Sequence, residues 1–370
     1  HEHGIVLEPG QSVTDYGDIT LAAGGAILGV TLGCLISVIY LHVKYRGAGS
    51  ALADAAGTPK SGRATMKELL SIAVPITLGS AGLQIINLFD TMIYMRRLEL
   101  GLGWSVEMAE NLKGVYNYQQ TIFALPCAFI PTITIACIPA ITAALTRREL
   151  DNVRATEESA IRTMALVAMP CAAGLFAMAE PVIRLLCTSY TPEQLAVATK
   201  MLMILGVAVI FNSLVLLFNA FMQAHGDVTS PVINMFIGGI VKIAVNYVLV
   251  GIPEINIVGA PVGTLVCYVV ITVLNYFALR RCVKGNLPIF RNLIRPLIAS
   301  AIMGAGTFMV YRVLRTLLPS GRLACLAALL FAMCLYLILA VALRCITYED
   351  CMLLPKGEKI AKILRIREKN

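Results

Sequence analysis

The sequence is dominated by apolar runs of roughly 20 residues, the length an α-helix needs to cross the hydrocarbon core of a bilayer. Hydrophobic residues make up 58% of the chain and charged residues only 14%, whereas soluble proteins carry about a quarter charged residues. A chain with so little charge could not cover its own surface in water. We therefore expect an all-α polytopic membrane protein, and the composition excludes a disordered chain or a secreted disulfide scaffold.

About nine transmembrane helices are expected. Their approximate ranges are 19–43, 69–95, 115–145, 161–179, 196–222, 231–250, 259–279, 296–314 and 323–343. Segment 44–66 is rich in Gly, Ala, Ser and charge, which predicts a flexible linker. Residues 1–18 are polar, and 347–370 form a weakly apolar basic tail that we expect to lie as an amphipathic helix on the membrane surface. Because the chain opens with His1 and shows no signal sequence, we expect it to be the C-terminal part of a longer protein.

The distribution of basic residues predicts an orientation. The segments outside the predicted spans alternate between the two sides of the membrane. Of the 30 Lys and Arg residues, 21 lie in the segments of one side, which include 44–67 and 344–370, and only 8 lie in those of the other side. The positive-inside rule places the richer set in the cytoplasm. The linker and the C-terminus are therefore expected inside, and 1–18 outside.

Motifs for enzymatic chemistry are missing from the sequence. It contains no Walker loop, no GxSxG and no HExxH, and its four histidines are too scattered to suggest a metal site. The eleven cysteines form no CxxC pair and lie mostly in apolar runs, where they are typical of small core residues. We expect no enzyme activity, metal, cofactor or nucleic-acid partner.

Charged residues within spans are costly and therefore informative. Asp90 lies in 69–95, and Lys242 and Asn246 stand four residues apart on one face of 231–250. A mid-span ammonium needs a partner or a water-filled cavity, so a functional role is favoured for Lys242. Asp90 lies near the predicted outer boundary of its span. An interfacial carboxylate that is merely solvated is therefore the alternative to a functional role.

Uncharged polar residues also occur in the spans. They are Asn87, Asn212 and Asn219, with Gln223 just beyond the end of a span. Hydrogen bonding between helices is the usual role of such side chains, and ligand contact is the alternative. Span 115–145 contains Pro126, Pro131 and Pro139, so we expect a bent or broken helix there. This break could be a hinge or a static kink.

Three stretches carry a family resemblance. The longest is 219–264, with the elements Gln223-Ala224-x-Gly226-Asp227, Pro231, Lys242, Asn246-Tyr247, Asn256-Ile257-x-Gly259-Ala260 and Thr264. The others are 68–98 and 125–145. Together they resemble the SpoVB-like and MurJ-like flippases, of the superfamily that also contains the MATE exporters. The resemblance implies fourteen spans in two lobes, of which this chain matches the sixth to the fourteenth.

On that resemblance, the chain divides into six parts. They are an outer segment at 1–18, the last span of the N-terminal lobe at 19–43, a cytoplasmic linker at 44–66, a six-helix C-terminal lobe at 67–279, two additional spans at 280–346 and a cytoplasmic tail at 347–370. The implied location is the bacterial cytoplasmic membrane, with several passes.

The implied function is transfer of an undecaprenyl-linked oligosaccharide or peptidoglycan precursor by alternating access, in cell-wall or spore-cortex synthesis. A cell-wall synthesis complex and membrane lipid are the implied partners. Arg96, Arg97 and Lys113 are candidates to bind the pyrophosphate, and ordinary solvated loop charges are the alternative. Some MurJ-like relatives bind sodium between the spans that correspond to 69–95, 231–250 and 259–279. Lys242 could replace that ion, with Asp90 as its counter-charge and Asn246 and Thr264 as hydrogen-bond partners.

Two other classes stay open at the level of sequence. A MATE-type cation-coupled drug exporter would share the lobe, but such exporters usually stop at twelve spans, before 296–314 and 323–343. A membrane scaffold without transport activity would have no need of the lysine at 242.

Overall fold

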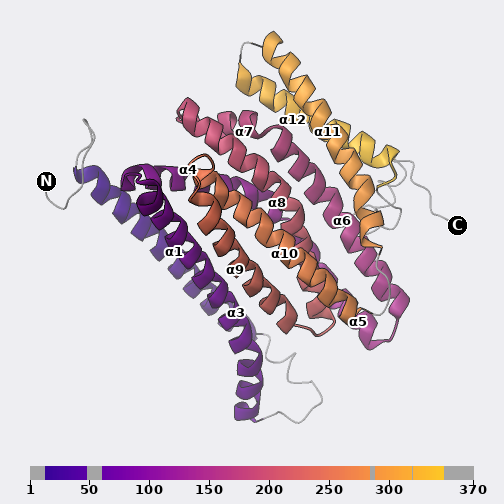
Figure 1. The fold of residues 1–370 in the computed structure, drawn as a ribbon. Helices are drawn as coiled ribbons and strands as arrows, with labels where there is room; N and C mark the ends of the chain where they lie inside the picture. The colour runs from indigo at the N-terminus through magenta and orange to yellow at the C-terminus, as the bar shows by residue number, and fades with distance from the viewer. Residues whose placement is uncertain (1–12, 48–60, 284–287, 319, 346–370) are drawn as a thin grey trace. The chain divides into compact units, whose positions relative to one another are not determined.

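The computed structural model describes residues 13–47, 61–283, 288–318 and 320–345. Within these ranges the chain is helical and contains no strand. The helices are α1 (Val13–Gly47), α3 (Gly62–Arg96), the π-helix η1 (Arg97–Gly101), α4 (Val106–Cys127), α5 (Ile130–Thr146), α6 (Leu150–Ala177), α7 (Ala179–Leu186), α8 (Pro192–Ala224), α9 (Thr229–Val250), the 3₁₀-helix η2 (Asn256–Val258), α10 (Gly259–Cys282), α11 (Ile289–Leu317) and α12 (Gly321–Ala342) (Figure 1).

Eight helical segments of the described chain are long and apolar enough to cross a membrane. They are Ile27–Arg46, Val106–Thr146, Leu150–Ala177, Pro192–Ala224, Thr229–Val250, Asn256–Cys282, Ile289–Leu317 and Gly321–Ala342. The expected all-α polytopic membrane fold is confirmed. The ninth predicted span, 69–95, lies within the 35-residue α3, which is not among the eight.

Several boundaries differ from the predicted ones. α1 begins at Val13, inside the segment predicted as an outer loop, and both α1 and α3 extend into the predicted linker. Most of the connection between the predicted spans 69–95 and 115–145 is also helical. The reason is that apolar length measures only the hydrocarbon crossing, whereas helical hydrogen bonding continues through polar residues beyond it. The linker residues 48–60 and the tail 346–370 lie outside the described part.

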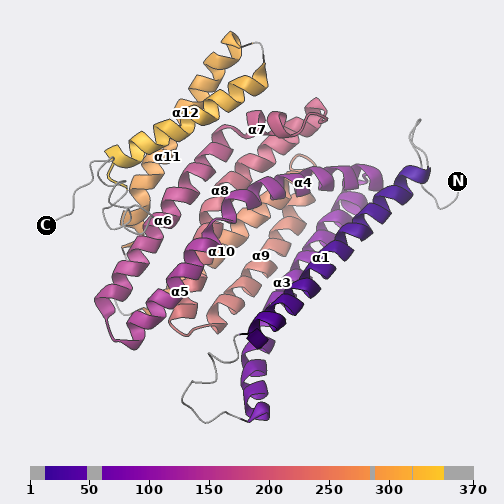
Figure 2. The same ribbon diagram turned by 180° about the vertical axis from the view of Figure 1, so that it is seen from behind.

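The chain divides into two compact units, His1–Ala73 and Val74–Asn370. The first contains α1 and the beginning of α3, and every side chain of α1 that the structure describes is exposed. In the second unit α6, α8 and α10 lie side by side in both views (Figures 1 and 2), and α8 supplies much of the core. Phe218 and Phe221 of α8 pack there with Met164 of α6 and Ile141 of α5, all nearly inaccessible to solvent.

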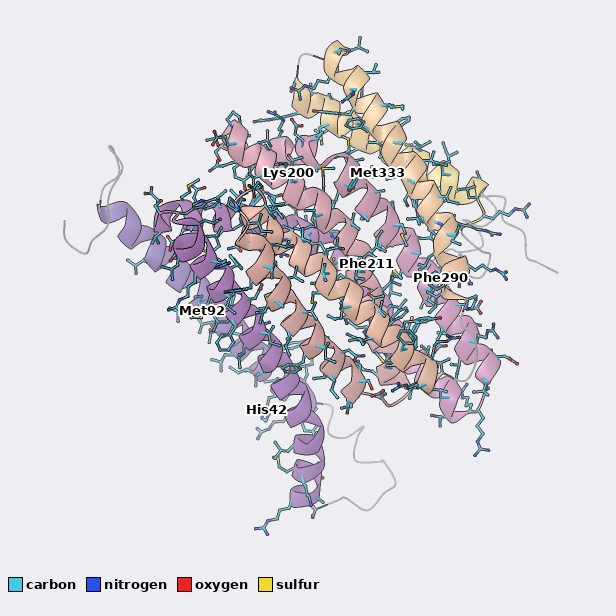
Figure 3. All side chains as sticks on the ribbon, in the orientation of Figure 1. His42, Met92, Lys200, Phe211, Phe290 and Met333 are labelled. Atoms are coloured by element: carbon cyan, nitrogen blue, oxygen red, sulfur yellow. The ribbon has the colours of Figure 1, made fainter. Side chains whose placement is uncertain are left out.

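Local signals fix where the helices begin. Ser105 caps α4 by accepting a hydrogen bond from the Met108 amide, and Thr191 forms a capping box with Gln194 at the start of α8. The last two helices, α11 and α12, pack against α6, to which Tyr336 donates a hydrogen bond at the Leu166 carbonyl. Phe290 and Met333 on these two helices are exposed, as expected for side chains in contact with lipid (Figure 3).

Candidate functional site

Glycines bring α9 unusually close to its neighbours in the second unit. A Cβ atom on Gly238 would overlap Ile271 of α10, and one on Gly239 would lie 2.7 Å from Ile86 of α3. Small residues at such contacts let membrane helices approach each other closely. Lys242 lies about one helical turn further along α9 and Asn246 about two, and Asn246 lies between Asp90 of α3 and Gly263 of α10.

A buried ion pair occupies this space. The ammonium of Lys242 lies 3.0 Å from Asp90 Oδ2, and the two side chains are only 15% and 4% exposed. Asn246 Nδ2 donates to the other carboxylate oxygen of Asp90 at 2.6 Å. Lys242 also donates to Asn87 Oδ1 at the weaker distance of 3.5 Å. Both oxygens of the carboxylate are thus engaged, which fits the rule that buried charges persist only when paired and hydrogen-bonded.

A second polar layer lies beside this pair on α4 and α10. The hydroxyl of Tyr116 is within 3.1 Å of Thr264 Oγ1 and accepts a hydrogen bond from Gln120. Tyr94 packs edge-on against the Tyr116 ring. Thr264 was expected to bond to the Lys242–Asp90 pair, but its hydrogen bonds go to Tyr116 and to the Ala260 carbonyl. The cause is that Tyr116, on a helix distant in sequence, reaches the Thr264 hydroxyl.

The arrangement is electrically balanced but still accessible on one side. Lys242 retains a small exposed fraction, whereas Asp90 and Asn246 are closed off. An ammonium has three donors, and the two contacts above leave one for water or an anion. The side chains therefore form a fixed cation whose counter-charge is built into the neighbouring helix.

Asn219 belongs to a different structure, a chain of three buried amides. Asn234 of α9 donates to Asn275 of α10 at 2.9 Å, and Asn275 donates to Asn219 of α8 at 2.8 Å. This is the interhelical role, and it ties three helices together. Of the other polar candidates, Asn212 is half-buried on α8 beside Cys127, and Gln223 is exposed.

The structure brings together only two of the three predicted phosphate-binding cations. Arg96 and Arg97 both line a groove between α3, η1 and α9, whereas Lys113 lies half-buried on α4 and does not line it. Arg97 stacks on the ring of Tyr247, with its guanidinium carbon 4.7 Å from the ring centroid.

The proline-rich span is interrupted. α4 ends at Cys127 and α5 begins at Ile130, with Pro126 in the last turn of α4 and Pro131 in the first turn of α5. The expected break is present at residues 128–129. Pro139 lies inside α5, which continues through it.

At the opposite end of the helices, the turn between α8 and α9 holds further ionisable groups. His225 Nε2 lies 2.8 Å from Oε1 of Glu157, which is fully buried. The Asp227 carboxylate accepts hydrogen bonds from the backbone amides of Thr229 and Ser230 at the start of α9. Partial burial of Asp227 disfavours its charge, but the hydrogen bonds that it accepts from Ser230, Cys282 and Thr229 together outweigh that effect and lower its pKa below the usual value.

Sequence reasoning missed Tyr116, Gln120, Asn275 and the Glu157–His225 pair. A signal was available for Asn275, since it is an amide inside the span 259–279. For Tyr116 the residue type gave no signal, because tyrosine is common in apolar helices, and its partner Thr264 is 148 positions away.

Comparison with known proteins agrees with this architecture. The sequence model of the family described as lipid II flippase MurJ matches residues 10–337. The chain is 28% identical over 311 residues to the uncharacterized membrane protein YabM of Bacillus subtilis, which covers 82% of this chain and 56% of YabM. It is 26% identical over 263 residues to stage V sporulation protein B of the same organism, which covers 70% of this chain and 49% of that protein.

A similar solved structure is that of lipid II flippase MurJ in an inward closed conformation. The TM-score is 0.58 at 13% sequence identity, over 82% of this chain and 59% of that one, so the likeness concerns the fold. The chain spans about half the length of the curated relatives it matches. Because the family model covers most of the chain, from the first helix into the last, this multi-pass membrane protein belongs to the MurJ lipid II flippase family.

Proposed function

We propose that this chain acts in a flippase that moves a lipid-linked oligosaccharide or peptidoglycan precursor across the bacterial cytoplasmic membrane, in cell-wall or spore-cortex synthesis. Family membership supports transport rather than catalysis. The similarity to stage V sporulation protein B supports a use in sporulation. Since the chain spans about half of its relatives, the substrate and the complete transport cycle are proposals for the whole protein.

The physical difficulty of this transport is the head group. A pyrophosphate and its sugars cannot be desolvated in hydrocarbon at acceptable cost, so they need a polar path while the lipid tail stays in the membrane. Alternating access provides such a path by exposing one polar cavity to one side at a time. A helix bundle used in this way must keep polar groups inside the membrane and must be able to change shape.

One observation carries the proposal: the largely buried Lys242–Asp90 ion pair with its Asn246 partner. A purely structural bundle gains little from such a pair, because replacing it by well-packed apolar residues is often neutral or stabilising. Its retention within a span supports a role in transport.

Within that role, we propose that Lys242 serves as a built-in cation. Its ammonium occupies the place between α3 and α9 where a mobile ion would otherwise neutralise Asp90. On this proposal the Asp90 carboxylate is neutralised at all times, so the transport step does not require an ion to bind at this place. The competing possibility is that Lys242 contacts the phosphate of the substrate directly.

Binding is the first test of the function. The purified chain in nanodiscs is incubated with an undecaprenyl-pyrophosphate-linked sugar or with an amphiphilic cation such as ethidium. Native mass spectrometry then measures the fraction of the chain that is bound to each ligand. The proposal expects selective retention of the lipid-linked sugar. Selective retention of ethidium would instead indicate a drug exporter, and retention of neither would favour a scaffold.

Translocation in liposomes that contain the complete protein then separates the two roles of Lys242. Lys200→Met is the matched control, since Lys200 is an exposed lysine on α8 (Figure 3). A built-in cation predicts that Lys242→Met makes transport sodium-responsive while the substrate's Kd stays within about twofold. A variant that binds substrate at least tenfold more weakly and stays insensitive to sodium would favour direct phosphate contact.

The proposed orientation places the C-terminus in the cytoplasm, as the distribution of basic residues predicts. The Val250 end of α9, and with it Arg96 and Arg97, then faces outward. A cell-wall synthesis complex is the proposed partner.

A further inference from the structure

The groove between α3, η1 and α9 combines an apolar wall with two cations. It has a volume of about 670 Å³, within the range of pockets that hold small ligands. Its apolar lining includes Ile93, Ile240, Ile243, Ala244 and Val248, and Arg96 and Arg97 lie at one end. From Ile240 to Val248 the wall extends about 12 Å along α9, the length of a substantial part of an acyl chain.

The position of Arg97 is fixed by packing rather than by a carboxylate. Its guanidinium stacks on Tyr247, and a Cβ atom on Gly251 would come within 2.5 Å of its Nε atom. That Nε atom is buried and has no hydrogen-bond partner among the described residues. The guanidinium is therefore held in one place while its charge is left without an anion.

Arg96 adds a second cation to the same end of the groove. It is exposed, and within the described ranges neither it nor Arg97 forms an ion pair. Glu99 follows closely in sequence but does not line the groove. The groove end thus carries two guanidinium groups, whose planar donors suit phosphate oxygens.

Both arginines line the groove beside the end of the α9 span, which finishes at Val250. Arg96 is the last residue of α3, and Tyr247 lies in the last turn of α9. Tyrosine is enriched at this level, where head groups meet hydrocarbon. The apolar wall runs from there toward the middle of the α9 span. A lipid phosphate would therefore contact the two arginines while its acyl chain contacts the apolar residues of α9.

We propose that this groove binds an anionic membrane phospholipid, with its phosphate on Arg96 and Arg97 and an acyl chain along α9. The occupant is a phosphatidylglycerol-type lipid rather than a zwitterionic one, because the described groove offers cations and no carboxylate for a choline or ethanolamine group. This site is separate from the Lys242–Asp90 pair and does not depend on the proposed transport function.

The sequence provides its own probe. Trp104 is the only tryptophan of the chain. It lies three residues after Gly101, which lines the groove, and its backbone amide donates to the Leu98 carbonyl of η1. Bromine atoms on an acyl chain quench tryptophan over short range, so Trp104 emission reports brominated lipid near η1, and the groove variants below identify the part of the quenching that comes from the groove.

The experiment reconstitutes the full chain in bilayers that contain equal fractions of phosphatidylglycerol and phosphatidylcholine, with only one of them brominated at a time. The proposal expects stronger quenching by the anionic lipid. The affinity for phosphatidylglycerol should exceed that for phosphatidylcholine by at least about fivefold, the factor that one favourable arginine near a membrane surface supplies. Arg96→Gln with Arg97→Gln should bring the ratio close to one. Arg312→Gln is the matched control, since Arg312 also stacks on a ring, that of Phe308, and does not line this groove.

A second variant tests the apolar lining of the groove and leaves both arginines unchanged. Ala244→Phe fills the groove and should reduce quenching by both brominated lipids, with circular dichroism unchanged. Equal quenching by the two lipids in the unaltered chain would overturn the proposal, as would an unchanged ratio in the double arginine variant. Loss of the preference on adding inorganic phosphate would assign the cations to a free anion and would also overturn it.

Discussion

Asn246 fills the space that Gly263 leaves empty: a Cβ atom at 263 would overlap the carboxamide of Asn246. The absence of a side chain on α10 therefore allows the amide to lie between the helices and to donate to Asp90. The candidate site depends on this glycine as much as on its charged residues.

Gly263→Ala should consequently displace Asn246 and break its hydrogen bond to Asp90. We expect a loss of about 2–4 kcal/mol, from overpacking together with an unsatisfied buried carboxylate oxygen. Thermal unfolding in detergent measures it. Gly174→Ala on α6 is the control, since a Cβ atom there meets nothing within 4 Å. A Tm equal to that of the control would contradict the close packing.

Removal of one partner of the ion pair should cost more than removal of both. Lys242→Met leaves the Asp90 carboxylate buried without a counter-charge, and we expect about 3–5 kcal/mol of destabilisation. Asp90→Asn added to Lys242→Met should restore much of that loss. Chemical denaturation of the single and double variants tests this, and additive losses would show that the two groups are not coupled.

The buried amide chain should be sensitive at its middle member. Asn275→Leu removes one donor and one acceptor, leaving Asn234 and Asn219 without these partners. We expect about 1–3 kcal/mol of destabilisation. Gln223→Leu, at an exposed amide, should change the unfolding midpoint little. Equal effects of the two substitutions would remove the case for a structural amide chain.

The start of α9 should be sensitive to acid. Because the pKa of Asp227 is lowered in the folded chain, its contribution to stability is present above the ordinary value of 3.8 and is lost as the pH falls below it. Asp227→Ala should cost about 0.5–2 kcal/mol at pH 7. The difference between variant and unaltered chain should shrink toward pH 3. A difference that is constant with pH would show that the carboxylate charge is not involved.

Orientation can be tested with single cysteines in a variant from which the eleven native ones have been removed. Ser105→Cys, at an exposed position before α4, should react with an impermeant thiol reagent in intact cells. Asn152→Cys, exposed at the start of α6, should react only after permeabilisation. The reverse pattern would overturn the proposed cytoplasmic C-terminus.

The sequence was sufficient to predict the membrane class, most spans and the Lys242–Asn246 face, because apolar length and helical spacing are local properties. It also predicted the interruption near Pro126 and Pro131. The partner of Thr264 was predicted wrongly, since the Tyr116 hydroxyl that reaches it comes from a helix far away in sequence. The short α7 was not predicted, because its eight residues are too few to give a span signal.

The amide chain has a mechanical consequence for α8, α9 and α10. Three helices joined through Asn219, Asn275 and Asn234 resist sliding past one another, because any shift would break hydrogen bonds that hydrocarbon cannot replace. We expect these three helices to move as one rigid unit. Deformation during a working cycle would then concentrate at the interrupted backbone of residues 128–129, where α4 can tilt against α5 without loss of regular helical bonds.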